Sequence, residues 1–373
     1  MSAATDQQPT PAHADTTPYQ TVGMMSVPAP MKIRLPPLES IWRWPRYVSP
    51  HLAEIEEECL RWSASFGAFD PETQRLIHEY GKLNLLAGMC YARMPKEHLR
   101  SGCDLMHLFF MFDEHSDHAT PEEVWHQASI QIDALCHPHK PRPKGEWVGG
   151  EFARQFWLRL PKTATKTFKR RFLETWIDYV ESVAQQAEHR SQSRILDLES
   201  YFLLRRHTSG APSTIALWEL DMDIPDEVRD HPILRMLETL AVDIIVIGND
   251  LLSYNKEQAA GDDEHNIVTV LMAQFGLGVQ EAIDRAGALC REKTERFNAL
   301  YGLVPRWVGP VDLDVQRLVD GMAQCVSGVL HWSYESQRYF GTRGLVVKRT
   351  RTVCLLPKTK AKSAAGGRWV RGE

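Results

Sequence analysis

The sequence carries two groups of oxygen-bearing side chains at the ends of apolar helical faces. The first is FFMFDEHSD, in which Asp113 and Asp117 lie four residues apart on one face and Glu114 lies beside them. The same face is apolar before them, at steps of four, three and four: Leu99, Cys103, Met106 and Phe110. Buried carboxylates without partners are costly or shift their pKa, so they call for a nearby cation. The alternative is a helix end at which these acids simply reach water.

The second group is GNDLLSYNKE, where Asn249, Ser253 and Glu257 form one helical stripe at i, i+4 and i+8. Amide, hydroxyl and carboxylate oxygens are hard ligands that suit Mg²⁺. Asp250 adjoins this stripe, and Lys256 adds a positive charge at its end. The stripe alone is common on solvated helices. Paired with DExxD on another helix, it predicts a magnesium site.

A Mg²⁺ ion held by few protein ligands usually shares its coordination with substrate phosphates, which predicts cationic donors nearby. Arg205-Arg206 precedes a helix break at TSGAP, and Arg338-Tyr339 follows the apolar face that includes Trp332. A guanidinium matches phosphate in a bidentate manner. Most Arg residues are surface groups, but Arg338 ends an aromatic face, which makes a surface role a poorer explanation for it.

Helices are the elements expected to position these groups. Two further faces repeat at helical steps: Leu318, Met322, Cys325, Val329, Trp332, and Met236, Leu240, Ile244, Ile247, Leu251. The run Ile244–Ile247 could be a buried strand, but helical spacing continues on both sides of it, which favours a helix. Gly and Pro separate such segments, and period-two alternation is nearly absent. The pattern predicts one all-α domain over residues 38–345.

Composition excludes several classes of protein. With 373 residues, 43% hydrophobic and 24% charged, the chain is ordinary globular protein and neither wholly disordered nor collagen-like. Its net charge of −5 does not favour nucleic-acid binding, although it combines +8 over residues 343–373 with −13 before them. Residues 1–37 contain seven prolines and are expected to be disordered or draped, and residues 346–373 to form a basic tail.

The cysteine pattern and the lack of a visible signal peptide indicate a reducing compartment. Seven scattered Cys residues without a CxxC predict no disulfide framework. Cys136, His137 and His139 look faintly like metal ligands, but they lie in a Pro-rich loop and no second pair completes a zinc site. No signal peptide and no apolar run of about 18 residues is visible. We therefore expect a soluble, cytoplasmic protein without stable membrane insertion.

The motifs DEHSD, NDLLSYNKE and Arg338-Tyr339, in this order, resemble those of the class I terpene synthases over most of residues 38–345. The longer strings GCDLMHLFFMFDEHSD, NDLLSYNKEQAAGDDEHNIVTVLM and WSYESQRYFG are most similar to fungal sesquiterpene cyclases, with a general similarity to protoilludene synthases. Many relatives have DDxxD, and Glu114 in the second place is a common fungal variant.

The resemblance implies a single-domain, all-α helical bundle with a deep central cavity and three Mg²⁺ ions at its mouth. Asp113 would bridge metal ions, and Asp117, counted with the metal residues, would orient and gate. Asn249, Ser253 and Glu257 would hold another ion. The implied substrate is farnesyl diphosphate, which is ionised and cyclised to a sesquiterpene hydrocarbon, with protoilludene formed through a humulyl-type cation as the candidate product. The enzyme would act as a monomer or homodimer.

The resemblance also assigns the remaining site residues. Arg206 would sense the diphosphate, preferred to Arg205 because it lies four residues before Gly210. Ser209 would be the linker and Gly210 the effector at the helix break. The other assignments are diphosphate binding by Lys256, Arg338 and Tyr339, and carbocation stabilisation by Phe110 and Trp332, with Phe109 as a further candidate. Each aromatic face would contribute about 0.5–2 kcal/mol.

Three alternatives remain open at this point. A chain-elongating prenyltransferase would use two DDxxD-type motifs, and the second motif here is NDxxSxxxE. A di-iron bundle needs two ExxH pairs, of which one, Glu123–His126, is present. A non-enzymatic helical protein could use the basic tail on acidic partners or membranes, but would leave both acidic motifs unexplained.

Overall fold

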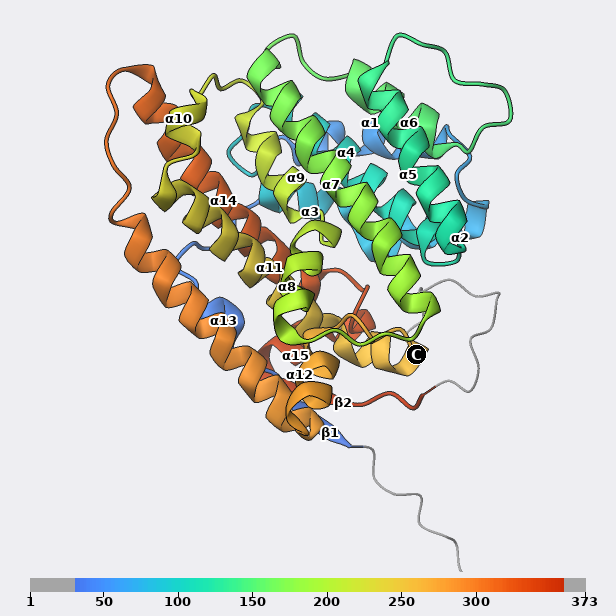
Figure 1. Ribbon diagram of the computed structural model, residues 1–373, viewed down its shortest axis with the longest axis vertical. Coiled ribbons are helices and arrows are strands. Elements are labelled where there is room, and N and C mark those ends of the chain that lie inside the picture. Colours follow the sequence, from blue (N-terminus) through green and yellow to red (C-terminus); the bar gives the residue numbers. More distant parts are fainter. Residues whose placement is uncertain (1–30, 359–373) are drawn as a thin grey trace, which may run out of the picture.

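Helices dominate the part of the chain that this computed structural model describes, residues 31–358, as the helical periodicity predicted (Figure 1). The long elements are, in order, α1 (Leu52–Ala64), α3 (Leu83–Cys90), α4 (Lys96–Ser116), α5 (Pro121–Cys136), α6 (Gly149–Leu158), α7 (Lys166–Ser191), α8 (Leu198–Thr208), α11 (Pro232–Ala260), α12 (Ile267–Phe275), α13 (Val279–Tyr301) and α14 (Pro310–Glu335). The short ones are η1 (Leu38–Ser40), α2 (Pro71–Leu76), η2 (Ile77–Gly81), α9 (Ala211–Ala216), η3 (Leu217–Glu219), α10 (Asp226–Arg229), η4 (Gly341–Arg343) and α15 (Gly344–Thr350). The prediction of an all-α bundle is confirmed.

The helix α11 is the central element of the bundle. It packs against α13 and α14 along its length, and also against α8, α9 and α12 (Figure 1). Pro232 begins it, where a missing backbone N–H costs nothing, and Gly261 ends it in the left-handed region at φ 72°. The run Ile244–Ile247 lies in the middle of this helix and is buried on all sides, so the helical interpretation of that run is confirmed.

The helix α4 carries the first acidic motif at its C-terminal end. Its buried face contains Leu99, Cys103 and Met106, and packs against α1, α3 and α6. Asp117 is the residue just past the last helical turn. Asp113 and Asp117, which continue the predicted apolar face, therefore lie at the C-terminal end of α4.

Two irregularities interrupt the helices next to the core. The π-helix η2 ends at Lys82, which has φ 48°, before α3 begins. Gly210 has φ 66° and separates α8 from α9. Glycine is the residue that adopts this conformation without a steric cost, so the break falls where the sequence places a glycine.

Packed structure extends beyond both predicted domain boundaries, into the segment up to residue 37 that was expected to be disordered or draped. The strand β1 (Lys32–Arg34) pairs antiparallel with β2 (Thr352–Cys354), and Ile33 lies opposite Val353. Ile33 and Leu35 are buried, because alternate apolar residues of this segment face the helices. The rest of the two predicted terminal segments, residues 1–30 and 359–373, lies outside the described residues.

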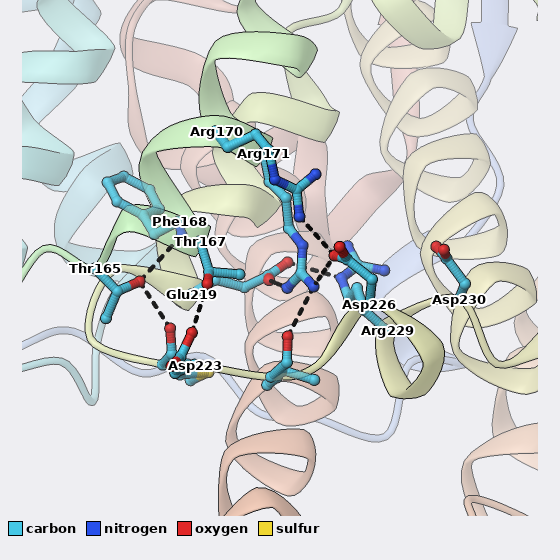
Figure 2. A network of polar contacts seen from close by, with 12 residues as sticks. Thr165, Thr167, Phe168, Arg170, Arg171, Glu219, Asp223, Asp226, Arg229 and Asp230 are labelled. Carbon is cyan, nitrogen blue, oxygen red and sulfur yellow. Dashed lines mark hydrogen bonds and ion pairs between the residues drawn. The ribbon is translucent and has the colours of Figure 1, made fainter.

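A buried ionic network lies at the N-terminal end of α7 (Figure 2). Glu219, 2% exposed, accepts hydrogen bonds from Arg171 Nη1 at 2.5 Å and from Arg229 Nε at 2.7 Å. Arg171 Nη2 also donates to the Ile224 carbonyl and to Asp226 Oδ1, each at 2.7 Å. These contacts tie η3 and α10 to the first turns of α7.

In the described range 31–358, no single helix combines the length and apolar character needed to cross a bilayer; α12 and α13 pass that test only as a pair bent by 113°.

Candidate active site

Both acidic motifs face one cavity of about 210 Å³, which α4, α7, α8, α11 and α14 enclose. The next pocket found among the described residues measures about 10 Å³. Of the site residues that the resemblance assigned, these line the larger cavity: Phe110, Asp113, Asp117, Ser209, Asn249, Lys256, Glu257, Trp332, Arg338 and Tyr339. The further candidates Phe109 and Arg205 line it as well. The helical phases read from the sequence therefore converge on one site.

The inner part of the cavity is apolar and aromatic. Its lining residues of this kind are Leu86, Cys90, Met106, Phe109, Phe110, Ile245, Val329 and Trp332. Phe110 and Trp332 meet edge to face with centroids 5.9 Å apart. Trp332 is held by a hydrogen bond from Nε1 to the Gly81 carbonyl at 2.8 Å, so the end of η2 fixes this ring.

Phe109 also lines the cavity, from a different side. Its ring contacts Trp176 and Tyr179 of α7 at centroid distances of 5.2 and 4.9 Å. A Cβ on Gly210 would lie 2.7 Å from Phe109 Cε1. Glycine at the α8–α9 break is therefore required for close approach as well as for its backbone conformation.

The rest of the lining carries charge of both signs. The acids are Asp113, Asp117, Glu257 and Asp262, and the bases are Arg190, Arg205, Lys256 and Arg338. An apolar interior with a charged rim suits a ligand that is hydrocarbon at one end and anionic at the other.

On the α4 wall, Arg338 holds the aspartate-rich motif. Its Nη2 lies 3.2 Å from Asp113 Oδ2 and its Nη1 lies 3.5 Å from Glu114 Oε1, while its guanidinium covers the Phe110 ring at 4.6 Å. Glu114 is buried and is not among the lining residues, so it positions Arg338. Asp117 Oδ1 accepts from Arg190 Nη1 of α7 at 3.2 Å.

On the α11 wall, the predicted stripe is present but its members differ in access. Asn249 Oδ1 accepts from Arg205 Nη2 at 3.0 Å, and its Nδ2 donates to Tyr339 Oη at 2.9 Å. Glu257 Oε2 accepts from Asn266 Nδ2 at 2.9 Å. Ser253 lies between them, fully buried, with Oγ 3.4 Å from the Asp250 carbonyl, and is not among the lining residues.

The structure places the side chains of Arg205 and Arg206 differently: Arg205 lines the cavity, and Arg206, which the resemblance favoured, does not. Arg206 is not among the lining residues, and its guanidinium donates to Asp243 at 2.7 and 3.1 Å, beside Lys293 of α13. Arg205 lines the cavity and donates to Asn249 and Asp250. Adjacent helical residues point about 100° apart, so the spacing to Gly210 could not decide which of the two faces the site.

Gly210 itself is not among the lining residues, although its neighbours Ser209 and Ala211 are. The Gly210 carbonyl accepts from the backbone N–H and the Oγ1 of Thr214, each at 3.0 Å. Ser209 Oγ donates to the Arg206 carbonyl at 2.9 Å and accepts from Ala211 N–H at 3.2 Å. These bonds fix the break at the edge of the cavity.

Asp250, which the sequence marks only as a neighbour of Asn249, accepts hydrogen bonds from two other helices. Its Oδ2 accepts from Tyr201 Oη at 2.5 Å and from Ile267 N–H at 2.7 Å, and its Oδ1 accepts from Arg205 at 2.9 Å. Burial lowers the pKa of Arg205, but Asp250, Tyr201 and Glu257 together outweigh burial and raise that pKa above its usual value. Asp250 therefore joins α8, α11 and α12 around a permanently charged arginine.

The oxygen donors present fit a divalent metal by their chemistry. Within residues 31–358, His, Cys, Asp and Glu alone form no cluster of three or more that could hold an ion. The candidate donors are carboxylates, an amide oxygen and a hydroxyl, which are the hard ligands of magnesium. In the structure, guanidinium groups of Arg338 and Arg205 contact Asp113 and Asn249, so these oxygens already attract positive charge.

Comparison with known proteins agrees with this geometry. Residues 104–296 match the model of terpene synthase family 2, C-terminal metal binding. A Delta(6)-protoilludene synthase of Stereum hirsutum is 46% identical over 346 residues, covering 91% of this chain and 93% of the relative. A Delta(6)-protoilludene synthase of Armillaria gallica is 44% identical, covering 88% and 94%.

Solved structures share the same architecture. A cucumene synthase variant is 28% identical with a TM-score of 0.69, covering 80% of this chain and 99% of that one. Germacradien-4-ol synthase from Streptomyces citricolor, at 24% identity, has a TM-score of 0.67 over 78% of this chain and 96% of its own, which shows a shared fold.

Proposed function

The chain belongs to the terpene synthase family and is a terpene cyclase, and on that premise we propose that it is a magnesium-dependent sesquiterpene synthase acting on farnesyl diphosphate. One observation carries this proposal: the two oxygen-rich motifs and four basic side chains surround the rim of a single cavity whose interior is apolar and aromatic. Such a cavity can hold a diphosphate at its rim and a prenyl chain inside.

The first chemical event is cleavage of the allylic C–O bond, with the electron pair leaving on the diphosphate. Arg205, Lys256, Arg338 and the Tyr339 hydroxyl line the cavity where this charge develops. Preorganised donors aimed at developing charge typically lower the barrier by about 3–4 kcal/mol for each donor. Arg205 replaces Arg206 in this role, because Arg206 points towards Asp243 instead.

The metal would be held by Asp113 on α4 and by Asn249, Ser253 and Glu257 on α11, and we propose three Mg²⁺ ions as in the family the motifs resemble. When bound, the metal supplies Lewis acidity that neutralises the leaving diphosphate. The protein's own part is to present oxygen donors from two walls. Ser253 is buried between its partners, so its use requires a small local rearrangement of the α11 stripe.

The carbocation that remains must be shielded from water. Phe110 and Trp332 present aromatic surface inside the cavity, and an aromatic face stabilises a cation by about 0.5–2 kcal/mol. The apolar interior excludes water, which would otherwise quench the cation. No dedicated base is needed, because the released diphosphate can accept the final proton.

The relatives named as protoilludene synthases support Delta(6)-protoilludene, formed through a humulyl-type cation, as the proposed product. Incubation of the purified protein with Mg²⁺ and geranyl, farnesyl or geranylgeranyl diphosphate tests substrate and product together. We expect one major sesquiterpene hydrocarbon from farnesyl diphosphate by gas chromatography with mass spectrometry. Formation of longer prenyl diphosphates would support a chain-elongating prenyltransferase instead.

A further inference from the structure

Two amide side chains on α11 point away from the cavity at the turn that carries its charged residues. Asn255 and Gln258 are 7% and 5% exposed and flank Lys256 and Glu257, both of which line the cavity. Buried amides require hydrogen-bond partners. Three of their hydrogen bonds go to one distant segment, at Cys354 and Leu356. Gln258 Nε2 also donates within α11, to the Asn255 carbonyl at 3.1 Å and to Asn255 Oδ1 at 3.5 Å.

The Asn255 side-chain amide bonds both a carbonyl and an N–H of this segment, as the backbone of a neighbouring strand would. Its Nδ2 donates to the Cys354 carbonyl at 3.1 Å and its Oδ1 accepts from Leu356 N–H at 2.8 Å. Gln258 Nε2 donates to the Leu356 carbonyl at 2.9 Å. The edge of the C-terminal strand is thus bonded to side chains of α11.

The other edge of the same segment is fixed to the rest of the protein. β2 pairs with β1, and Leu355 N–H donates to the Met31 carbonyl at 2.8 Å. Gln280 of α13 then holds β1 through two bonds with the Arg34 backbone, at 2.8 and 3.0 Å. We call β1, β2 and residues 355–356 the clasp. It connects the end of α11 to α13.

The position of this turn matters for the chemistry. The last turn of a helix lacks part of its backbone hydrogen bonding, so its placement depends on outside contacts. On the opposite side, Asn266 contacts Glu257 and the Asp250 carbonyl. The clasp and Asn266 therefore hold the turn from two sides, and a misplacement of about 1 Å in a reacting group can cost about 100-fold in rate.

We propose that Asn255, assisted by Gln258, is a positioning residue that fixes Lys256 and Glu257 by bonding the α11 turn to the clasp. This inference rests on the proposed function, because it concerns the diphosphate and metal site. It assigns the C-terminal segment a role in catalysis rather than in fold stability alone.

The test compares Asn255→Leu with Gln280→Met. Both substitutions remove a two-bond amide contact to the clasp, but only the first lies on α11. Three quantities are measured: the Kd for inorganic diphosphate in the presence of Mg²⁺, by calorimetry; backbone hydrogen exchange at the end of α11; and kcat and KM with farnesyl diphosphate.

We expect Asn255→Leu to weaken diphosphate binding about tenfold or more, to speed hydrogen exchange in residues 255–260 and to lower kcat. Gln280→Met, which loosens only the α13 end of the clasp, should change each of the three by clearly less than Asn255→Leu does. Equal effects of both substitutions, or a folded Asn255→Leu with unchanged diphosphate binding, would overturn the proposal. If Asn255→Leu does not fold, Asn255→Asp keeps the acceptor for Leu356 N–H, loses the donor to the Cys354 carbonyl and adds a negative charge. For that variant the deciding readout is hydrogen exchange in residues 255–260: faster exchange is expected, and unchanged exchange would overturn the proposal. An inactive wild type would instead count against the proposed function.

Discussion

At the scale of single residues, Arg205 and Arg206 show how one position separates a site residue from a structural one. Arg205 contacts Asn249 and Asp250 in the cavity, and Arg206 contacts Asp243 outside it. We predict that Arg205→Ala lowers kcat/KM about 100- to 1,000-fold, the usual cost of losing one donor to developing charge. Steady-state kinetics with farnesyl diphosphate measures this.

Arg206→Ala is the matched comparison. It should leave kcat/KM within about threefold and lower the melting temperature, because buried Asp243 would keep only Lys293 as a charged partner. A larger kinetic loss in Arg206→Ala than in Arg205→Ala would restore the assignment made from spacing alone.

His107 gives a pH dependence of stability. It is buried on α4 with Nε2 3.1 Å from Asn84 Oδ1, and burial lowers the pKa of His107 to about 3. Below its ordinary pKa of about 6.5, the unfolded chain binds a proton there that the folded chain does not. Stability from this group is therefore complete above about pH 6.5 and falls by roughly 1.4 kcal/mol per pH unit below it.

We predict that His107→Gln reduces the slope of unfolding free energy against pH between about pH 6 and 4, measured by urea denaturation. An unaltered slope in His107→Gln would contradict the assignment of His107 as neutral in the folded state.

The sequence predicts a site residue correctly where the phase of its own helix is enough to determine which way its side chain points. Asp113, Asn249 and Glu257 reach the cavity because the apolar faces of their helices point there. Arg205 and Asp250 depend on how α8 is rotated against α11 and α12, and no local pattern encodes that rotation. Packing between helices sets it instead.

At the scale of elements, the break at Gly210 places Phe109 against the cavity. Alanine at position 210 would have to keep the positive φ of Gly210, costing about 1–2 kcal/mol, and its Cβ would lie 2.7 Å from the Phe109 ring. We predict that Gly210→Ala alters the ratio of terpene products and lowers kcat/KM about tenfold. Product analysis by gas chromatography with mass spectrometry checks both.

Gly276 provides the comparison, since it also has a positive φ, 65°, but no atom lies within 4 Å of its added Cβ. Gly276→Ala should lose stability without changing the products. If both variants keep the wild-type product ratio, contact between Gly210 and Phe109 does not shape the cavity.

The elements themselves were largely predictable, and the exceptions have physical causes. Strong 3.6-residue periodicity marked α4, α11 and α14. The π-helix η2 and the left-handed Lys82 left no such mark, because the Trp332 bond to the Gly81 carbonyl and neighbouring packing impose them. The β1–β2 pair joins segments more than 300 residues apart, which local patterns cannot indicate.

At the scale of the whole molecule, the net charge of −5 conceals an organised distribution. Acids and bases gather at the rim of the cavity, and the described part of the C-terminal region packs on α11 and α14 rather than standing apart. The prolines before residue 37 suggested disorder, but Ile33 and Leu35 bury enough apolar surface to dock that segment. Composition alone could not reveal this docking.

The central claim is that Asp113 on α4 and Asn249 on α11, which line one cavity, make this chain a metal-dependent farnesyl diphosphate cyclase. The most direct measurement is the volatile product formed from farnesyl diphosphate and Mg²⁺ by the wild type, Asp113→Ala and Asn249→Ala, each confirmed as folded by circular dichroism. We expect a sesquiterpene hydrocarbon from the wild type, none after chelation of the metal, and at least about a 100-fold loss in each variant. Undiminished turnover in either variant, or no hydrocarbon from the wild type, would contradict the account.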